Sequence, residues 1–218
     1  MTALEQAITE LTQPIAGQFP RPWMTDLTAP QEANVFVVGK NQRNGYDASN
    51  ITHERHLDAL FNRHGETCRG LYNEITGNSP SPTRLNTDRF RDLLKTEGVD
   101  RVVETNVVCY STPMSSHLRL AHNVAGTRNG KEVFSALLQI IQPKVLIVHG
   151  AGAAKELSAV LAAQLPDEPS ESSPPAFAQV GKQTIFVIPS LAPPAFNKWS
   201  KWSVPHLKKV ASAIAKAL

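Results

Sequence analysis

Four short apolar segments rich in valine and isoleucine are the clearest pattern in this sequence. They comprise residues 34–38, 101–109, 144–148 and 184–188. The two central segments are apolar at nearly consecutive positions, which is typical of strands buried on both faces of a parallel sheet. We therefore predict four strands in a central, mainly parallel sheet.

Helical spacing of apolar residues marks the regions between and around these segments. Pro143 ends one such region, while Ser203 and Pro205 fit the N-cap and first turn of the last one. Alternating strands and helices predict right-handed βαβ units. The expected fold class is α/β, a three-layer α/β/α sandwich with a four-stranded sheet. The predicted helices lie within residues 2–11, 57–61, 87–97, 133–141, 153–165 and 204–218.

The length of the chain and its polar segments predict a single domain. Its 218 residues are enough for one well-formed core. Residues 167–175 are acidic and rich in serine and proline, and no second core follows them, so they fit an exposed loop. Residues 1–218 are expected to form one domain, in which residues 1–30 make an N-terminal helix and a proline-rich lead-in.

Composition limits the classes of function without selecting one. The 22 Lys and Arg residues against 19 Asp and Glu residues give a net charge of +3, which permits a nucleic-acid partner without requiring it. No apolar run approaches the roughly 20 residues that span a bilayer, and the first residues lack a secretory pattern. Cys68 and Cys109 fit a reducing compartment and are too few to hold an iron–sulfur cluster. We expect a cytoplasmic monomer with no membrane contact, no metal and no cofactor.

Turn-forming and polar residues occur at the carboxyl end of each predicted strand. These end segments are residues 39–42, 106–110, 149–152 and 188–191. Ligands of open α/β sheets bind outside the carboxyl ends of the strands. The joint occurrence of Gly, Asn, His and Pro-Ser therefore predicts a ligand site at this edge of the sheet.

The order of these motifs resembles that of the uracil-DNA glycosylase superfamily. Residues 35–41 (VFVVGKN) are similar to its first motif, a strand running into Gly-x-Asp/Asn/Glu, and residues 104–109 (ETNVVC) are similar to its central strand. Residues 143–150 (PKVLIVHG), followed by an alanine-rich helix, resemble a strand that ends in Gly, and residues 187–190 (VIPS) stand where the superfamily has His-Pro-Ser. The resemblance extends over residues 35–202 and implies a mainly parallel sheet of the uracil-DNA glycosylase type.

The resemblance implies a DNA glycosylase that hydrolyses the N-glycosidic bond of uracil or a related deaminated base. Asn41 would hold the attacking water through its carboxamide oxygen, and Ser190 would belong to the same catalytic set. The alternative for Asn41 is a turn residue beside Gly39. An amide is a poor general base, so turnover should be modest.

Base recognition would fall to Gly39, Asn106 and one aromatic side chain. The amide of Asn106 can pair with both the N–H and the C=O edge of uracil, although an Asn at a strand end also bonds neighbouring backbone. Tyr72 and Tyr46 compete as the floor on which the base stacks, and the alternative for Tyr72 is simple packing. The resemblance predicts that Asn41, Asn106, Ser190 and one aromatic ring converge on a single cleft.

Three positions depart from the superfamily pattern. Gln42 replaces the usual Pro, Ile188 replaces the usual His, and Asn41 stands where other branches have Asp. His149 could take over the role of the missing histidine, or could be a histidine that is hydrogen-bonded at a strand end. On this interpretation, restoring histidine at position 188 should raise activity. The insertion at residues 43–66 has no counterpart that we can place.

DNA contacts are expected from basic residues and from the aromatic segment after residue 190. Stacking and phosphate contact use both types of side chain, but clustered Trp and Phe also anchor terminal helices. The rim of the cleft should be positive, so that binding weakens with salt. The expected DNA-binding residues are Lys40, Arg43, Arg84, Pro189, Phe196, Lys198, Trp199 and Lys201.

Two further hypotheses remain beside the glycosylase. The departures at Gln42 and Ile188 favour a catalytically silent member of the same fold that binds nucleic acid or a nucleotide-like ligand. A small-molecule nucleotide-binding protein would use the turn at residues 150–152, which resembles part of a dinucleotide fingerprint but lacks its third Gly or Ala. His53 and His56 have no credible set of metal ligands around them.

Overall fold

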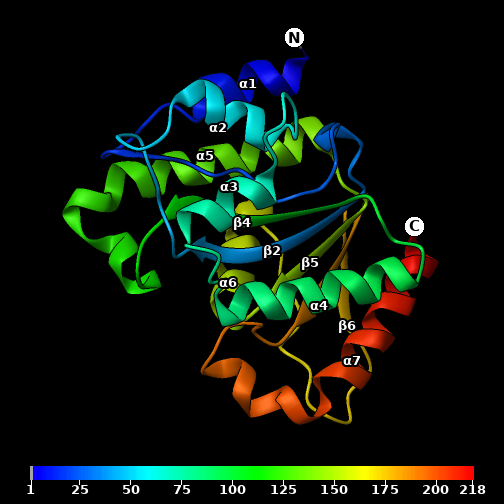
Figure 1. Ribbon diagram of the computed structural model, residues 1–218. Coiled ribbons are helices and arrows are strands. Elements are labelled where there is room, and N and C mark those ends of the chain that lie inside the picture. Colours follow the sequence, from blue (N-terminus) through cyan, green and yellow to red (C-terminus); the bar gives the residue numbers. More distant parts are fainter. Residues whose placement is uncertain (1) are drawn as a thin grey trace. The chain divides into compact units, whose positions relative to one another are not determined.

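The central sheet of the computed structural model, which describes residues 2–218, has five strands (Figure 1). Their order across the sheet is β4-β2-β5-β7-β6. β2 pairs with β5 in parallel, and β5 with β7 in parallel, whereas β6 and β7 are antiparallel. The strands are β2 (Val35–Gln42), β4 (Val102–Ser111), β5 (Val145–His149), β6 (Ala176–Val180) and β7 (Gln183–Ile188).

β4 runs in the same direction as β2. At the start of the pair, the N–H groups of Asn34 and Val35 donate to Arg101 O, and at its end Thr112 N–H donates to Gln42 O. Residue numbers therefore rise together along both strands. The predicted mainly parallel α/β sheet is confirmed, and all four predicted strands are present.

The prediction of only four strands is wrong, because β6 forms a fifth at the edge of the sheet. Its residues alternate between half-buried and exposed, and Phe177 is 56% exposed. An edge strand with one solvated face lacks the continuous apolar run that marks the other four. β6 and β7 form a hairpin whose turn contains Gly181 at φ +59°.

The strand order reverses at β2. Along the chain the parallel strands come in the order β2, β4, β5, β7, yet β4 and β5 lie on opposite sides of β2. Such a reversal is where open α/β sheets bind ligands, outside the carboxyl ends of the strands. The carboxyl end of β2, with Asn41, is therefore a place to look for a site.

Seven α-helices and three short 3₁₀ segments connect the strands of residues 2–218. Their N-caps follow ordinary rules in four cases, since the side chains of Thr2, Thr52, Thr67 and Ser81 each accept a backbone N–H of the first turn. The helices are α1 (Ala3–Leu11), α2 (His53–Leu60), α3 (Cys68–Ile75), α4 (Pro82–Thr96), α5 (Val124–Ile141), α6 (Ala151–Leu161) and α7 (Ala195–Ala217). The shorter elements are β1 (Gln18–Phe19), β3 (Tyr46–Asp47), η1 (Pro30–Glu32), η2 (Ser115–Arg119) and η3 (Ala121–Asn123).

The predicted start of the last helix is wrong. α7 begins at Ala195, so that Pro205 lies inside the helix. Ser203 is not an N-cap, because its Oγ donates to Ser200 O within the helix, 2.8 Å away. The aromatic and basic residues between 196 and 202 had the composition of a loop, but they form the first turns of α7.

Contacts divide the chain into two compact units. Unit 1 contains the chain up to Ala33, with Gly39–Ser79 and Val103–Gln142. Unit 2 contains Asn34–Val38, Pro80–Val102 and Pro143–Leu218. Among residues 2–218, no helix is both long and apolar enough to cross a bilayer.

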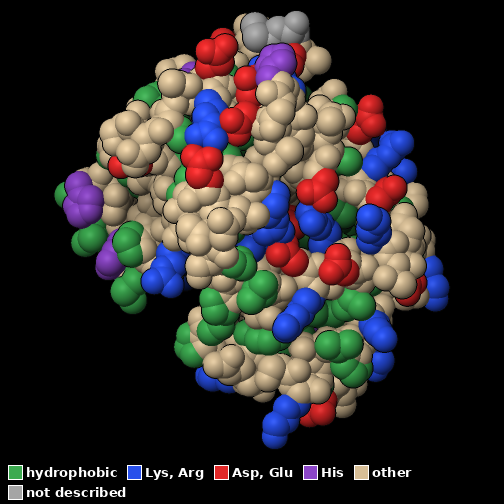
Figure 2. Space-filling model, viewed as in Figure 1, with side chains coloured by type: hydrophobic (Ala, Val, Ile, Leu, Met, Phe, Trp, Pro, Cys, Tyr) green, Lys and Arg blue, Asp and Glu red, His purple; other side chains and the backbone are tan. Residues whose placement is uncertain are grey.

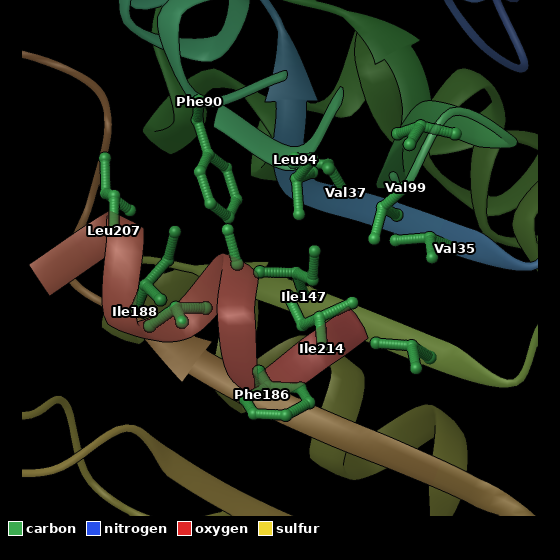
Figure 3. Packing of buried hydrophobic residues seen from close by; sticks show 14 of the residues in the cluster. Val35, Val37, Phe90, Leu94, Val99, Ile147, Phe186, Ile188, Leu207 and Ile214 are labelled. Carbon is green, nitrogen blue, oxygen red and sulfur yellow. The ribbon is translucent and has the colours of Figure 1, made fainter. Parts of the chain in front are cut away.

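Each unit buries its own apolar clusters. Unit 2 has a large one, in which β5 and β7 contribute Ile147, Phe186 and Ile188 against side chains of α4 and α7 such as Phe90 and Ile214 (Figure 3). In unit 1 the insertion at residues 43–66 forms β3 and α2. It packs through a cluster of Phe19, Tyr46, Ile51, Ala59 and Leu71.

α5 and β4 approach each other closely within unit 1. A Cβ atom on Gly126 would lie 2.3 Å from the Tyr110 ring, and one on Gly130 would lie 2.9 Å from the backbone nitrogen of Cys109. Larger residues at these two positions would push the helix away from the strand.

Candidate functional site

Asn41 presents a single free hydrogen-bond acceptor near the carboxyl end of β2. Its Nδ2 donates to Gln42 O at 3.0 Å and to Thr112 Oγ1 at 2.9 Å. A backbone carbonyl can only accept, which fixes the orientation of the amide. Within residues 2–218 no group donates to Asn41 Oδ1, and the residue is half-buried. The geometry leaves the carboxamide oxygen available for a water or a ligand.

Gln42, which replaces the proline of the superfamily motif, is buried and structural. Its Nε2 donates to Arg21 O, while its Oε1 is buried and has no hydrogen-bond partner in the described chain. The side chain thereby ties the carboxyl end of β2 to the segment before η1. A proline here could not make this bond.

Arg21 is a site residue that the sequence did not reveal. Its guanidinium carbon lies 5.1 Å from the centre of the Tyr46 ring and 5.5 Å from that of Tyr72. Its Nη1 also donates to Tyr46 Oη at 3.3 Å. Arg21 is half-buried and makes no ion pair with a carboxylate of residues 2–218. The two rings hold the guanidinium in place, and its charge is not neutralised by a carboxylate of residues 2–218.

The two candidate stacking rings are therefore partners of one cation. Tyr46 is 2% exposed and Tyr72 is 4% exposed. Burial raises the pKa of Tyr46, so this phenol stays protonated over the physiological range. Neither ring offers an open face, and a base could stack on one of them only after Arg21 moved aside.

Asn106 lies in the middle of β4 and not at its end, because the strand continues to Ser111. The side-chain amide makes no hydrogen bond within residues 2–218, and only the backbone oxygen is used, by Cys109 Sγ. The residue is half-buried. The amide is thus not engaged with neighbouring backbone.

Two other residues of the first motif, and Arg43 shortly after it, lie in unit 1. Gly39 is buried within β2, Lys40 is half-buried and Arg43 is exposed. Neither Lys40 nor Arg43 forms an ion pair with a described carboxylate. Lys40 and Arg43 therefore flank Asn41 in the sequence without a carboxylate partner in the described residues.

His149 ends β5 in unit 2 and is a neutral hydrogen-bond donor. Leu191 N–H donates to its Nδ1 over a long 3.5 Å, which leaves the proton on Nε2. Desolvation, with a smaller contribution from the positive charge of Arg84, lowers the pKa of His149 to about 4. Nε2–H has no acceptor in the described chain.

Ser190 and Gly150 bring the ends of β5 and β7 close together. A Cβ atom on Gly150, which has φ +88°, would lie 3.1 Å from Ser190 Cβ. Ser190 Oγ accepts from Ala192 N–H at 3.1 Å, while its backbone oxygen accepts from the Trp199 indole at 2.8 Å. The hydroxyl is thus occupied by its own turn, directly after Pro189.

The start of α4 packs on the same turn. Asn86 Nδ2 donates to Leu191 O at 2.9 Å. Arg84 is mostly buried, with 10% of its side chain exposed, and its Nε lies 3.2 Å from Asp88 Oδ1. The positive charge of Arg84 contributes to the lowered pKa of His149. Arg84 is therefore an inward-facing cation and not an exposed rim residue.

The aromatic residues of α7 form an anchor. Trp199 is 3% exposed, and its ring lies 5.4 Å from that of Phe196 and 5.2 Å from that of Trp202. A buried indole cannot act as a wedge in DNA, so Trp199 here follows the anchoring alternative. Lys198 and Lys201, on the same helix, are exposed.

Ile188 lies in the core. Its side chain is fully buried in the apolar cluster of unit 2, pointing toward the residues of α4 and α7 (Figure 3). On this backbone a histidine at position 188 would replace an apolar side chain of that cluster, and its effect on activity stays a prediction.

Two neutral histidines, the buried His56 and the half-buried His149, make stability depend on pH. Desolvation lowers the pKa of His56 to about 4, as it does for His149. In the unfolded chain both protonate near 6.5, so the unfolded state binds more protons between these values. The free energy of unfolding should fall as pH is lowered from about 6.5 to about 4. Urea titrations across this range would show it.

Variants at three histidines test whether His56 and His149 cause this pH dependence of the free energy of unfolding. His56→Gln and His149→Gln should each remove part of the slope, whereas His122→Gln, at an exposed position, should leave it intact. A slope that is unchanged in both variants would contradict the assignment.

Neither cysteine has the properties of a reactive thiol. Cys68 and Cys109 are free and buried, and desolvation raises their pKa to about 12 and about 11. No cluster of three or more His, Cys, Asp or Glu side chains in residues 2–218 could hold a metal ion.

The comparisons with known proteins give no family assignment. No protein-family model matches the chain, and no curated protein matches it either.

Proposed function

We propose that this protein hydrolyses the N-glycosidic bond of uracil or a related deaminated base in DNA. The observation that carries the proposal is the orientation of Asn41, whose amide nitrogen is saturated and whose Oδ1 is free beside the carboxyl end of β2. This is the arrangement that an acceptor for an attacking water needs.

The chemistry follows from this acceptor. As the bond to the base breaks, the sugar takes on oxocarbenium character and the base becomes an anion. Asn41 Oδ1 would accept a hydrogen bond from the water and orient it as the C1'–N bond breaks. The proton that the water loses on attack would pass to the departing base anion or to solvent. Because an amide is a poor base, rates should be lower than those of an enzyme with a carboxylate at this position.

A donor for the departing base is also needed, since developing negative charge is stabilised by preorganised N–H groups. The free amide of Asn106 has the donor and acceptor that match the edge of uracil.

One observation favours a second candidate, a catalytically silent protein that binds nucleic acid or a nucleotide-like ligand. Ile188 faces the core, so position 188 supplies no hydrogen-bond donor. Arg21, Lys40 and Arg43 would still provide cations without carboxylate partners.

A direct assay separates the two candidates. The protein is incubated with oligonucleotides that contain uracil, xanthine or hypoxanthine, and abasic sites are detected by alkaline cleavage. We expect slow release of at least one base, and binding that weakens with salt as neutralised phosphates release counterions. Salt-dependent binding without any abasic product would favour the silent protein, and salt-independent binding would argue against DNA altogether.

A further inference from the structure

β6 leaves one edge of the central sheet unpaired. It is the last strand of the sheet, and no strand of residues 2–218 pairs with its outer side. At the β4 edge the chain provides its own cover, because Met24 exchanges backbone hydrogen bonds of 2.8 and 2.9 Å with Glu104. An unpaired edge presents a row of backbone N–H and C=O groups to which another strand can bind.

The hairpin of β6 and β7 identifies the backbone groups that face outward. Val180 is followed by a two-residue turn to β7, in which Gly181 has φ +59°. The residues that flank such a turn form a hydrogen-bonded pair, and hydrogen-bonded and non-hydrogen-bonded pairs alternate along an antiparallel ladder. Ala178 therefore bonds β7, whereas the N–H and C=O groups of Phe177 and Gln179 point to the outer edge.

The side chains of β6 suit contact with another strand. The sequence of the strand (AFAQV) contains no charged residue and no proline, the residues that commonly protect an exposed edge. Phe177 lies opposite Phe186, with ring centres 5.5 Å apart, and so continues the apolar cluster of unit 2 to the edge. Phe186 is 2% exposed and Phe177 is 56% exposed, so the cover of this face ends between them. A strand added to β6 would cover Phe177.

The charges on either side of β6 favour a second copy of the chain as the added strand. Figure 2 shows Lys and Arg side chains interspersed with Asp and Glu over much of one face of the molecule. Residues 157–181 instead contain acids and no Lys or Arg, and Lys182 follows directly in the turn after β6. The acids are Asp167, Glu168 and Glu171, and they are exposed, as is Lys182. We call residues 167–171 the acidic segment.

A two-fold axis between two β6 strands pairs them in antiparallel orientation. With Ala178 opposite Ala178 of the second copy, Phe177 of each copy exchanges backbone hydrogen bonds with Gln179 of the other. The two Phe177 rings then lie diagonally on the same face, within reach of each other. The end of each β6, with Lys182, comes beside the start of the other, which the acidic segment precedes.

We propose that this protein forms a homodimer in which two β6 strands pair antiparallel and join two sheets into one. Main-chain hydrogen bonds and Phe177 hold the pair, and Lys182 of each copy faces the acidic segment of the other. Because two short strands bury little surface, the dimer is weak and depends on protein concentration. This inference departs from the monomer expected from the sequence, and it does not rest on the proposed function.

Exchange of charge tests the antiparallel pairing. K182E alone, and E168K/E171K alone, each place like charges at both contacts of a homodimer, whereas a mixture of the two variants places opposite charges at both. Dimerisation of the full chain is measured by sedimentation velocity at increasing protein concentration. We expect each variant alone to dimerise about tenfold more weakly than the wild type, and the mixture to regain the wild-type affinity. K155E, at an exposed lysine of α6, is the matched control and should dimerise as the wild type does.

Backbone pairing has its own measurement. Amide hydrogen exchange at Phe177 and Gln179 should slow as protein concentration rises, while exchange at Ala178, which already bonds β7, should change less. F177T removes the ring and should weaken dimerisation about tenfold. V204T, at a valine of α7 that is 52% exposed, should not.

A wild type that stays monomeric at every concentration would overturn the proposal. So would a dimer that neither K182E nor F177T weakens, since another surface would then hold it. A dimer in which the amides of Phe177 and Gln179 exchange as fast as in the monomer would exclude β6 as its interface. A mixture of K182E and E168K/E171K that dimerises no better than either variant alone would rule out the antiparallel arrangement.

Discussion

Asn41→Ala should lower the rate of base release by about a hundredfold or more, the range expected when a group that handles the attacking water is lost. The methyl group cannot accept a hydrogen bond, so the water loses its orienting partner. Affinity for a uracil oligonucleotide should change little, because Asn41 carries no charge. Single-turnover assays of abasic-site formation, at saturating protein, measure the chemical step without interference from binding.

Two controls keep this result interpretable. Asn50→Ala removes an exposed asparagine of the same unit and should leave release unchanged. Thr112→Val removes an acceptor of the Asn41 amide without touching Oδ1, so release should fall by less than in Asn41→Ala. An Asn41→Ala protein that releases base at the wild-type rate would show that the water is held elsewhere.

The strands that could be predicted were those with an apolar residue at nearly every position. β2, β5 and β7 are such strands, and their hydrophobic runs leave little choice of structure. β6 alternates between half-buried and exposed positions and lies beside a polar loop, so the run is absent. The start of α7 was missed because two prolines and several polar residues between Pro193 and Lys201 obscure its helical spacing.

The candidate site could be predicted only where a residue lies at a strand end. Asn41 was found in this way, since strand ends are readable from hydrophobic runs. Arg21 lies in a proline-rich segment without such a run, and its two tyrosines come from different elements, β3 and α3. No local pattern connects residues 21, 46 and 72, so this cation could be found only from the fold.

Side-chain direction was the other quantity that the sequence did not determine. Ile188 is the last residue of β7, where a strand passes from the core to the site edge. Successive side chains of a strand face opposite sides, and a shift of one residue exchanges core and site. The VIPS motif alone does not say which side Ile188 takes.

Ile188→His should therefore destabilise the protein and bring no gain in base release. The isoleucine is fully buried in the apolar cluster that includes Phe90 and Leu207 (Figure 3). An imidazole in its place would exchange dispersion contacts for a polar ring among hydrocarbon side chains, at a cost of about 3 kcal/mol in the free energy of unfolding. Urea denaturation at neutral pH measures this loss, and Ile188→Val, which only removes one methylene, should cost about 1 kcal/mol. If Ile188→His instead unfolds at the wild-type urea concentration and releases uracil faster, then its ring reaches the substrate. The turn after β7 would in that case have to rearrange, and the missing histidine would be the limit on turnover after all.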